Sequence, residues 1–120
     1  MYQKVLNSVL LALILVVLTT PAISAGVVVH DQAEYREAVK NARPGDVIQL
    51  ANGEWKNFEI LLTGQGLPDQ PITLTAEEKG KVFITGRSNL RLAGEHLIVS
   101  GLVFRDGYTP TSEVISLRHT

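Results

Sequence analysis

The residues that could support chemistry in this sequence include three histidines, and their spacing does not form a site. His30, His96 and His119 show neither the i, i+4 spacing nor the carboxylate neighbours of a metal centre. His96 directly follows Glu95, so on a strand the two side chains would point to opposite faces and could not act as a pair. We therefore interpret the histidines as structural and predict no catalytic or metal-ligating residue here.

The adjacent carboxylates are weak candidates for hydrolytic chemistry. Glu77 and Glu78 diverge if the chain is extended, and with the following Lys79-Gly80-Lys81 they indicate a solvated turn. Hydrolysis by two carboxyl groups requires both to be held on one face at a fixed separation. The spacing of the acidic residues does not hold two carboxyl groups on one face.

Arginines and two aromatic residues are the candidates for binding a ligand. If successive strands stack, arginines could form a ladder along an anionic chain, although ordinary surface charge is the alternative. Trp55 and Tyr108 could stack on sugar rings, but we expect Trp55 to pack at a corner of the chain. The candidate arginines are Arg87, Arg91, Arg105 and Arg118.

Composition excludes several classes of protein. The chain has 120 residues, enough for one domain. Lys4 is the only charge in residues 1–25, so the remainder carries 10 basic and 12 acidic residues, a net of 10 − 12 = −2, without the basic stripe of a nucleic-acid-binding protein. With no cysteine there are no disulfides, no thiolate metal ligands and no acylated lipoprotein anchor.

Residues 1–25 have the order of a secretory signal peptide. Lys4 precedes the apolar run 9–18, and small residues follow Pro21. The run is shorter than the roughly 20 residues that span a bilayer, although a retained, uncleaved anchor is the alternative. We expect cleavage after Ala25 or Ser24, secretion or periplasmic localisation, and no membrane association afterwards.

One helix is expected at the start of the mature chain, after the short apolar strand candidate 27–29. Asp31 can accept a hydrogen bond from the amide three residues on, and Glu34 can reach back, as in a capping box. Apolar residues then recur at intervals of three and four up to Ala42, and Arg43-Pro44-Gly45-Asp46 ends the pattern.

The rest of the chain is typical of many short strands. Alternation predicts an inward set that includes Ile72/Leu74 and Val82/Ile84, with Thr85 and Arg91 facing outward. Strands are expected at 47–50, 55–62, 72–76, 82–85, 90–92, 97–99, 102–104 and 114–117. An antiparallel sandwich or a parallel β-solenoid would accommodate them. Glycines just after strand candidates favour the corners of a solenoid, at Gly53, Gly86, Gly94, Gly101 and Gly107.

One run makes the chain recognisable, namely Ala42-Arg-Pro-Gly-Asp-Val-Ile-Gln-Leu-Ala-Asn-Gly-Glu-Trp55. It resembles the start of secreted parallel β-helix polysaccharide lyases, and the later motifs resemble the family of alginate lyases and chondroitinase B. Those motifs are Phe58-Glu-Ile, Gly64-Gln-Gly66, Pro71-Ile-Thr-Leu-Thr-Ala-Glu77, Gly80-Lys-Val-Phe-Ile-Thr-Gly86, Ser88-Asn-Leu-Arg-Leu-Ala-Gly-Glu95 and Leu97-Ile-Val-Ser-Gly-Leu-Val-Phe-Arg-Asp-Gly107.

The resemblance implies an all-β, right-handed parallel β-helix with a short N-terminal capping α-helix, truncated after the first few coils. Residues 26–120 would be the cap and first coils of a lyase domain. Asn52-Gly53, which locally predicts a hairpin, would instead turn a corner of the solenoid.

The resemblance also implies calcium-assisted β-elimination on a uronate-containing polysaccharide. Alginate is the preferred substrate, with chondroitin or dermatan sulfate as the alternatives. The family's calcium ligands, Lys base and Arg lie on later coils, so no catalytic residue and no calcium site is expected here. The fragment alone should show no turnover and poor solubility, because a solenoid needs stacked repeats and two polar ends. A non-catalytic carbohydrate-binding or surface module remains the second hypothesis.

Overall fold

The structure of the protein is a computed structural model that describes residues 26–118. The expected signal peptide and His119 lie outside the described residues. Within this range one helix and ten short strands follow each other. All strand-to-strand pairings between these named strands are parallel. This excludes the antiparallel sandwich and identifies a parallel β-helix.

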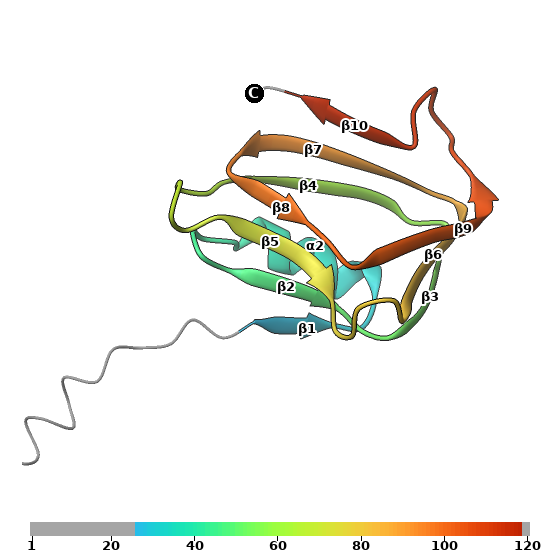
Figure 1. Ribbon diagram of the computed structural model, residues 1–120, viewed down its shortest axis with the longest axis horizontal. Coiled ribbons are helices and arrows are strands. Elements are labelled where there is room, and N and C mark those ends of the chain that lie inside the picture. Colours follow the sequence, from blue (N-terminus) through green and yellow to red (C-terminus); the bar gives the residue numbers. More distant parts are fainter. Residues whose placement is uncertain (1–25, 119–120) are drawn as a thin grey trace, which may run out of the picture.

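Three coils stack on one another in the described range (Figure 1). The first coil consists of β2 (Val47–Leu50), β3 (Gly53–Lys56) and β4 (Glu59–Gln65). The second consists of β5 (Ile72–Ala76), β6 (Val82–Arg87) and β7 (Asn89–Glu95), and the third of β8 (Leu97–Val99), β9 (Leu102–Tyr108) and β10 (Ile115–Arg118). Together with β1 (Val27–Val29) these strands form three sheets, ordered β1-β2-β5-β8, β3-β6-β9 and β4-β7-β10.

Asn52-Gly53 turns a corner of the solenoid and forms no hairpin, which confirms what the resemblance implied. Strand β2 pairs with β5, whereas β3 pairs with β6, so the two strands that flank this turn belong to different sheets. The local preference of Asn-Gly for a hairpin is therefore overridden by the pairing of each strand with the next coil.

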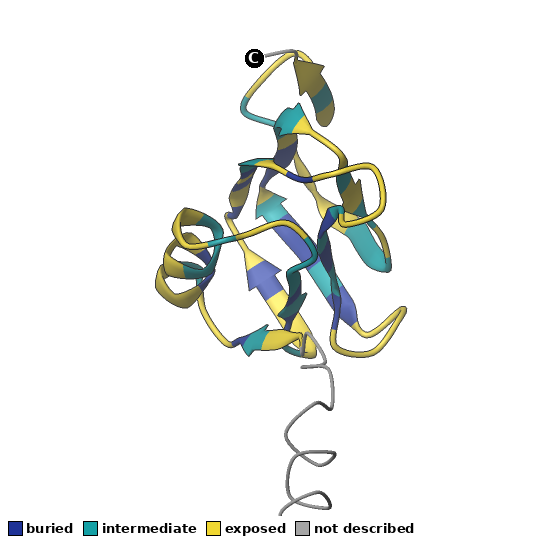
Figure 2. Ribbon diagram, turned by 90° about the vertical axis from the view of Figure 1, so that its left-hand side faces the viewer, coloured by how far each residue is buried: buried dark blue, intermediate teal, exposed yellow. Residues whose placement is uncertain are grey.

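The core is a column of aliphatic side chains from successive coils. Ile48 and Leu74 are neighbours in register and buried, and so are Ile60 and Leu90. Burial decreases toward the third coil, where the residues at the same inward positions are half-buried or exposed (Figure 2). The core is thus well buried between the first two coils and more exposed at the third.

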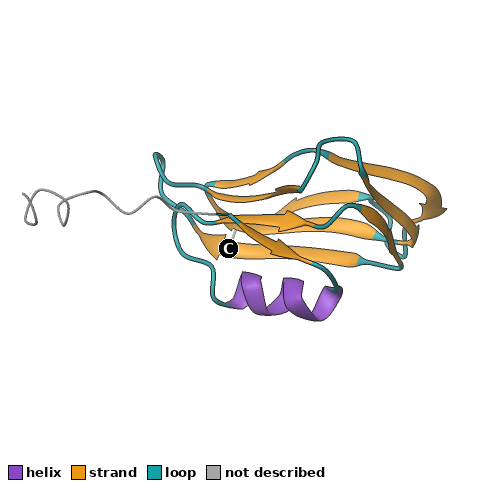
Figure 3. Cartoon of the chain, turned by 90° about the horizontal axis from the view of Figure 1, so that it is seen from below, coloured by secondary structure: helices purple, strands orange, loops and turns teal. Residues whose placement is uncertain are grey.

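Helix α2 (Gln32–Lys40) lies along one end of the stack (Figure 3). The side chain of Asp31 accepts a hydrogen bond from the amide of Glu34 at 2.8 Å, which confirms the predicted N-cap. Tyr35 is buried, meets the ring of Phe58 edge-on at 5.1 Å and donates its hydroxyl to the carbonyl of Leu61 at 2.9 Å. The helix therefore closes the first coil, as expected.

Two strand expectations were wrong. Residues 55–62 were expected as a single extended segment, but the chain turns at Asn57 (φ 56°), which separates β3 from β4. Asparagine adopts positive φ more readily than most residues, so the turn needs no glycine or proline. Thr85 was expected to face outward into solvent but is only 5% exposed, next to the irregularity in register between β6 and β9.

The glycine corners were correct in part. Gly53 and Gly101 lie at corners, but Gly86, Gly94 and Gly107 lie inside strands. Gly94 stacks on Gly64 and Gly107 on Gly86, and a Cβ on either upper glycine would collide with the backbone below. These glycines permit close approach of neighbouring coils rather than a turn.

Candidate functional site

The described residues contain no cluster of three or more His, Asp or Glu side chains able to hold a metal ion. His30 contacts only one carboxylate, with Nδ1 3.2 Å from Oε1 of Glu34. The His30 amide donates to the same oxygen at 3.0 Å, so the contact belongs to the helix cap. His96 has φ 53° and lies at the corner after β7, without an ion pair to Glu95 in the described range.

The carboxylates at 77 and 78 serve a structural corner, which agrees with their interpretation as a turn. Asn52 Nδ2 donates to Glu78 Oε1 at 2.9 Å and the Glu78 amide donates to Asn52 Oδ1 at 3.1 Å, which ties the first coil to the second. Lys81 Nζ lies 3.1 Å from Glu78 Oε2. Hydrogen bonds from Lys81 and Asn52, with the positive charge of Lys81, lower the pKa of Glu78.

The four candidate arginines do not form one ladder. Arg87 ends β6 and Arg105 lies in β9, both in sheet β3-β6-β9. The other two lie in sheet β4-β7-β10, where Arg91 stands between Leu61 and Ser116 and Arg118 stands over Ala93. All four are exposed, but none is stacked on another in register.

Arg105 is the candidate with a defined conformation. Its guanidinium lies over the ring of Phe83, with Cζ 3.7 Å from the ring centroid, which is a cation–π contact. Its Nε is 3.5 Å from Oδ2 of Asp106, and both side chains are largely exposed. Phe83 was not among the candidate residues expected from the sequence. Phe83 lies between Val82 and Ile84, which were expected to face inward, so the alternation in the sequence indicates that Phe83 faces outward.

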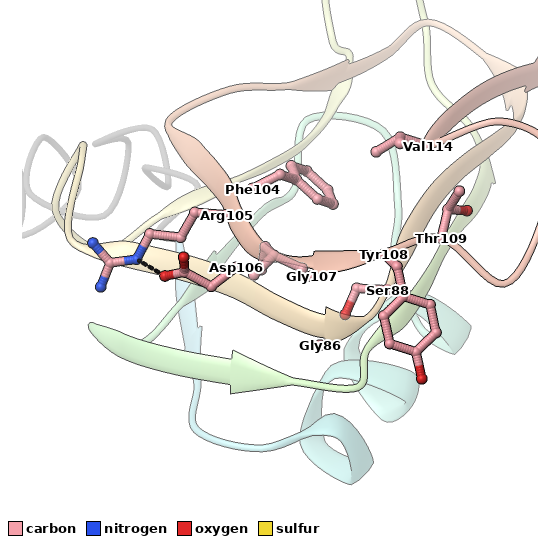
Figure 4. A pocket seen from close by; sticks show the side chains of 10 residues that line it. Gly86, Ser88, Phe104, Arg105, Asp106, Gly107, Tyr108, Thr109 and Val114 are labelled. Atoms are coloured by element: carbon pink, nitrogen blue, oxygen red, sulfur yellow. Dashed lines mark ion pairs between the residues drawn. The ribbon is translucent and has the colours of Figure 1, made fainter.

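Tyr108 and Trp55 differ sharply in exposure. Trp55 is buried, stacks on Phe58 at 5.3 Å and donates Nε1–H to the Ala51 carbonyl, so its predicted packing role is confirmed. Tyr108 is 69% exposed and borders a hollow of about 220 Å³ between β6, β9 and the loop after β9. In Figure 4 its ring and the Arg105–Asp106 pair project from the two ends of the same strand segment.

The inner surface of the third coil is apolar and open. Hollows of about 250 Å³ and 410 Å³ lie over it, lined mainly by aliphatic side chains of β7 to β10. Leu117 is 75% exposed and Ile115 54% exposed, although both pair in register with residues of the second coil. Phe104 and Leu102 are half-buried. This surface has the composition of a solenoid core without its next layer.

Comparisons with known proteins identify relatives of this fold. A family model described as Chondroitinase B matches residues 29–120. A search of curated proteins found no match. Among solved structures, the PL6 family alginate lyase AlyGC is similar with a TM-score of 0.75 and 60% identity, over 76% of this chain and 12% of that chain.

Two further structures are more distant. The PL6 family polysaccharide lyase Pedsa3628 from Pseudopedobacter saltans has a TM-score of 0.73 and 36% identity, over 76% of this chain and 21% of that chain. A mannuronic acid specific polysaccharide family 6 lyase from human gut microbiota has a TM-score of 0.66 and 26% identity, over 79% of this chain and 25% of that chain. The chain thus spans a quarter or less of each of these structures.

Proposed function

The chain belongs to the chondroitinase B family of polysaccharide lyases, and from this premise we propose that it forms the cap and first coils of an enzyme that cleaves a uronate-containing polysaccharide by β-elimination. The observation that carries the proposal is the 60% identity with an alginate lyase over 76% of this chain. The three-coil stack of this chain, with helix α2 over its first coil, also supports the proposal.

The proposed reaction breaks two bonds and forms one double bond. A base removes the proton at C5 of the uronate, the electron pair forms the C4–C5 double bond, and the 4-linked sugar leaves with its oxygen, which takes up a proton. The reaction needs positive charge near the carboxylate, a base at C5 and a donor for the leaving oxygen.

We place these groups outside the described coils. Within residues 26–118 there is no cluster of acidic side chains that fits a calcium ion, so a calcium requirement of the enzyme would depend on ligands elsewhere. The lysines within residues 26–118 are all exposed. The proposed role of these coils is to close and support the solenoid, which the helix over the first coil and the stacked strands favour.

The apolar surface of the third coil fits this supporting role. A further coil laid over β8, β9 and β10 would cover Leu117 and complete the burial of Phe104 and Leu102, as the second coil does for the first. We expect residues 26–120 expressed alone to aggregate and to lack turnover. A stable, dilute monomer would contradict this.

Alginate is the proposed substrate, and mannuronate blocks are a reasonable first choice. AlyGC is an alginate lyase, and the lyase from human gut microbiota is specific for mannuronic acid. The family model carries the description of chondroitinase B, so chondroitin and dermatan sulfate are the comparison substrates.

Secretion or periplasmic localisation is proposed with this function, because a polymeric substrate lies outside the cell. The order of residues in the segment 1–25 supports export. Within the described residues, no helix has the length and apolar character needed to cross a bilayer.

The test is an elimination assay on the full-length protein, meaning this chain together with the further coils that we propose follow it. The substrates are alginate, poly-mannuronate, chondroitin sulfate and dermatan sulfate. The new double bond absorbs ultraviolet light, so its appearance follows the reaction directly. We expect the absorbance to rise with alginate. Binding to alginate without any rise would favour the non-catalytic module and contradict the proposal.

A further inference from the structure

The outer face of sheet β3-β6-β9 carries features that the family assignment does not use. We propose that Arg105 and Tyr108 bind a polyuronate chain there, Arg105 through a sugar carboxylate and Tyr108 by stacking on a pyranose ring. The choice of a polyuronate as the ligand rests on the proposed function. The arrangement of the side chains on this face is independent of that function.

Arg105 is already held for such a contact. Its guanidinium lies over Phe83, with Cζ 3.7 Å from the ring centroid, and this contact restricts the orientation of its N–H donors before a ligand arrives. Its partner Asp106 is a single carboxylate at 3.5 Å, with 81% of the Asp106 side chain exposed. An exposed ion pair of this kind is weak. A ligand carboxylate that accepts two hydrogen bonds from the Arg105 guanidinium can therefore replace the carboxylate of Asp106.

Tyr108 supplies an exposed aromatic ring on a fixed backbone. It is 69% exposed, while its carbonyl accepts a hydrogen bond from the Ser88 amide at 3.0 Å. Figure 4 shows the ring clear of the other labelled side chains of the hollow. Aromatic rings with one accessible face are suited to the apolar faces of sugar rings. Arg105 and Tyr108 are three positions apart, so at about 3.3 Å per residue the two contacts lie roughly 10 Å apart along β9.

The charge of this face favours an anionic chain. Lys56 of β3 and Arg87 of β6 stand in the two coils below and form no ion pair within residues 26–118. Arg87 pairs with Tyr108 in register, so its charge lies beside the aromatic contact. With Arg105 these cations outnumber the carboxylates of Glu54 and Asp106 by three to two. The whole chain, by contrast, has a net charge of −1.

The test measures binding of mannuronate oligosaccharides to the full-length protein by isothermal titration calorimetry. Arg105→Ala and Tyr108→Ala should each weaken binding about three- to tenfold, because each removes one exposed contact. Tyr108→Phe keeps the ring and should bind like the wild type. Arg36→Ala removes an exposed helical arginine outside this face and is the matched control for loss of one positive charge.

The outcomes separate this inference from the proposed function. Wild-type affinity in Arg105→Ala and Tyr108→Ala, or an equal loss in Arg36→Ala, would overturn the binding face even if elimination proceeds. Equal affinity for a neutral glucan oligosaccharide would overturn the role of Arg105. Selective weakening in the two variants, without elimination of any polyuronate by the wild type, would support the face and contradict the lyase. Thermal melts of each variant show that lost binding does not reflect unfolding.

Discussion

Replacement of Gly94 by alanine tests the close stacking of the second coil on the first. Gly94 has φ 151° and pairs in register with Gly64. A Cβ at this position would collide with the carbonyl oxygen of Gly64 and lie 3.1 Å from its nitrogen and carbonyl carbon. Because these obstacles are backbone atoms inside a parallel ladder, they cannot rotate away as a side chain can.

The expected cost has two parts. A non-glycine residue at such a positive φ costs about 1–3 kcal/mol, and forcing an extra methyl group into a packed contact costs about 1–3 kcal/mol. We therefore expect Gly94→Ala to lower the free energy of unfolding by roughly 2–6 kcal/mol, the sum of these two contributions.

The matched control is Gly53→Ala. Gly53 also has a positive φ, 126°, but an added Cβ there meets nothing within 4 Å, so only the backbone term applies. Urea unfolding of the full-length protein, followed by circular dichroism, gives both values by linear extrapolation. If the two variants lose the same stability, the coils do not approach as closely at Gly94 as described, and the reasoning fails.

Three smaller changes test the cap and the first corner. Tyr35→Phe removes the hydroxyl that donates to the Leu61 carbonyl and should cost about 1 kcal/mol in urea unfolding. Asp31→Ala removes the N-cap and should cost about 1 kcal/mol by the same assay, so no loss would refute that cap. Lys81→Ala should raise the pKa of Glu78 toward its ordinary value, as measured by NMR titration. Because the pKa of Glu78 is lowered in the folded protein, ionised Glu78 stabilises the corner at neutral pH. This stabilisation is lost as the pH falls through the pKa of Glu78 in the folded protein.

The sequence predicted the fold well because two kinds of pattern agreed. Alternation placed Ile72, Leu74, Val82 and Ile84 inside, and the capping residue Asp31 located the helix. Neither pattern decided between a sandwich and a solenoid. The resemblance decided it, because pairing between strands whose partners lie 20 to 30 residues apart is not visible in the local sequence pattern.

The errors have local physical causes. Asn57 turns the chain without glycine or proline, so the boundary between β3 and β4 was not visible. Gly94 and Gly107 were taken for corners because a glycine that permits a turn and one that permits close stacking look the same in sequence. Thr85 is buried beside a register irregularity that alternation cannot anticipate.

The candidate site could be predicted only as a set of residue types. Arginines were identified, but a ladder depends on register, and the register separates Arg87 and Arg105 from Arg91 and Arg118 onto two sheets. The cation–π contact that orients Arg105 depends on Phe83 of the preceding coil, 22 residues earlier in the numbering. Such contacts follow from coil length and stacking, which the sequence did not specify before the fold was known.

The central claim is that this chain is the N-terminal part of a lyase, and the chemistry of the product tests it most directly. Full-length protein is incubated with a mannuronate oligosaccharide and the products are analysed by mass spectrometry. Elimination predicts a fragment with an unsaturated uronate at its new non-reducing end, lighter by one water than the corresponding hydrolysis product. Intact oligosaccharide, or fragments that have all gained water, would contradict the account.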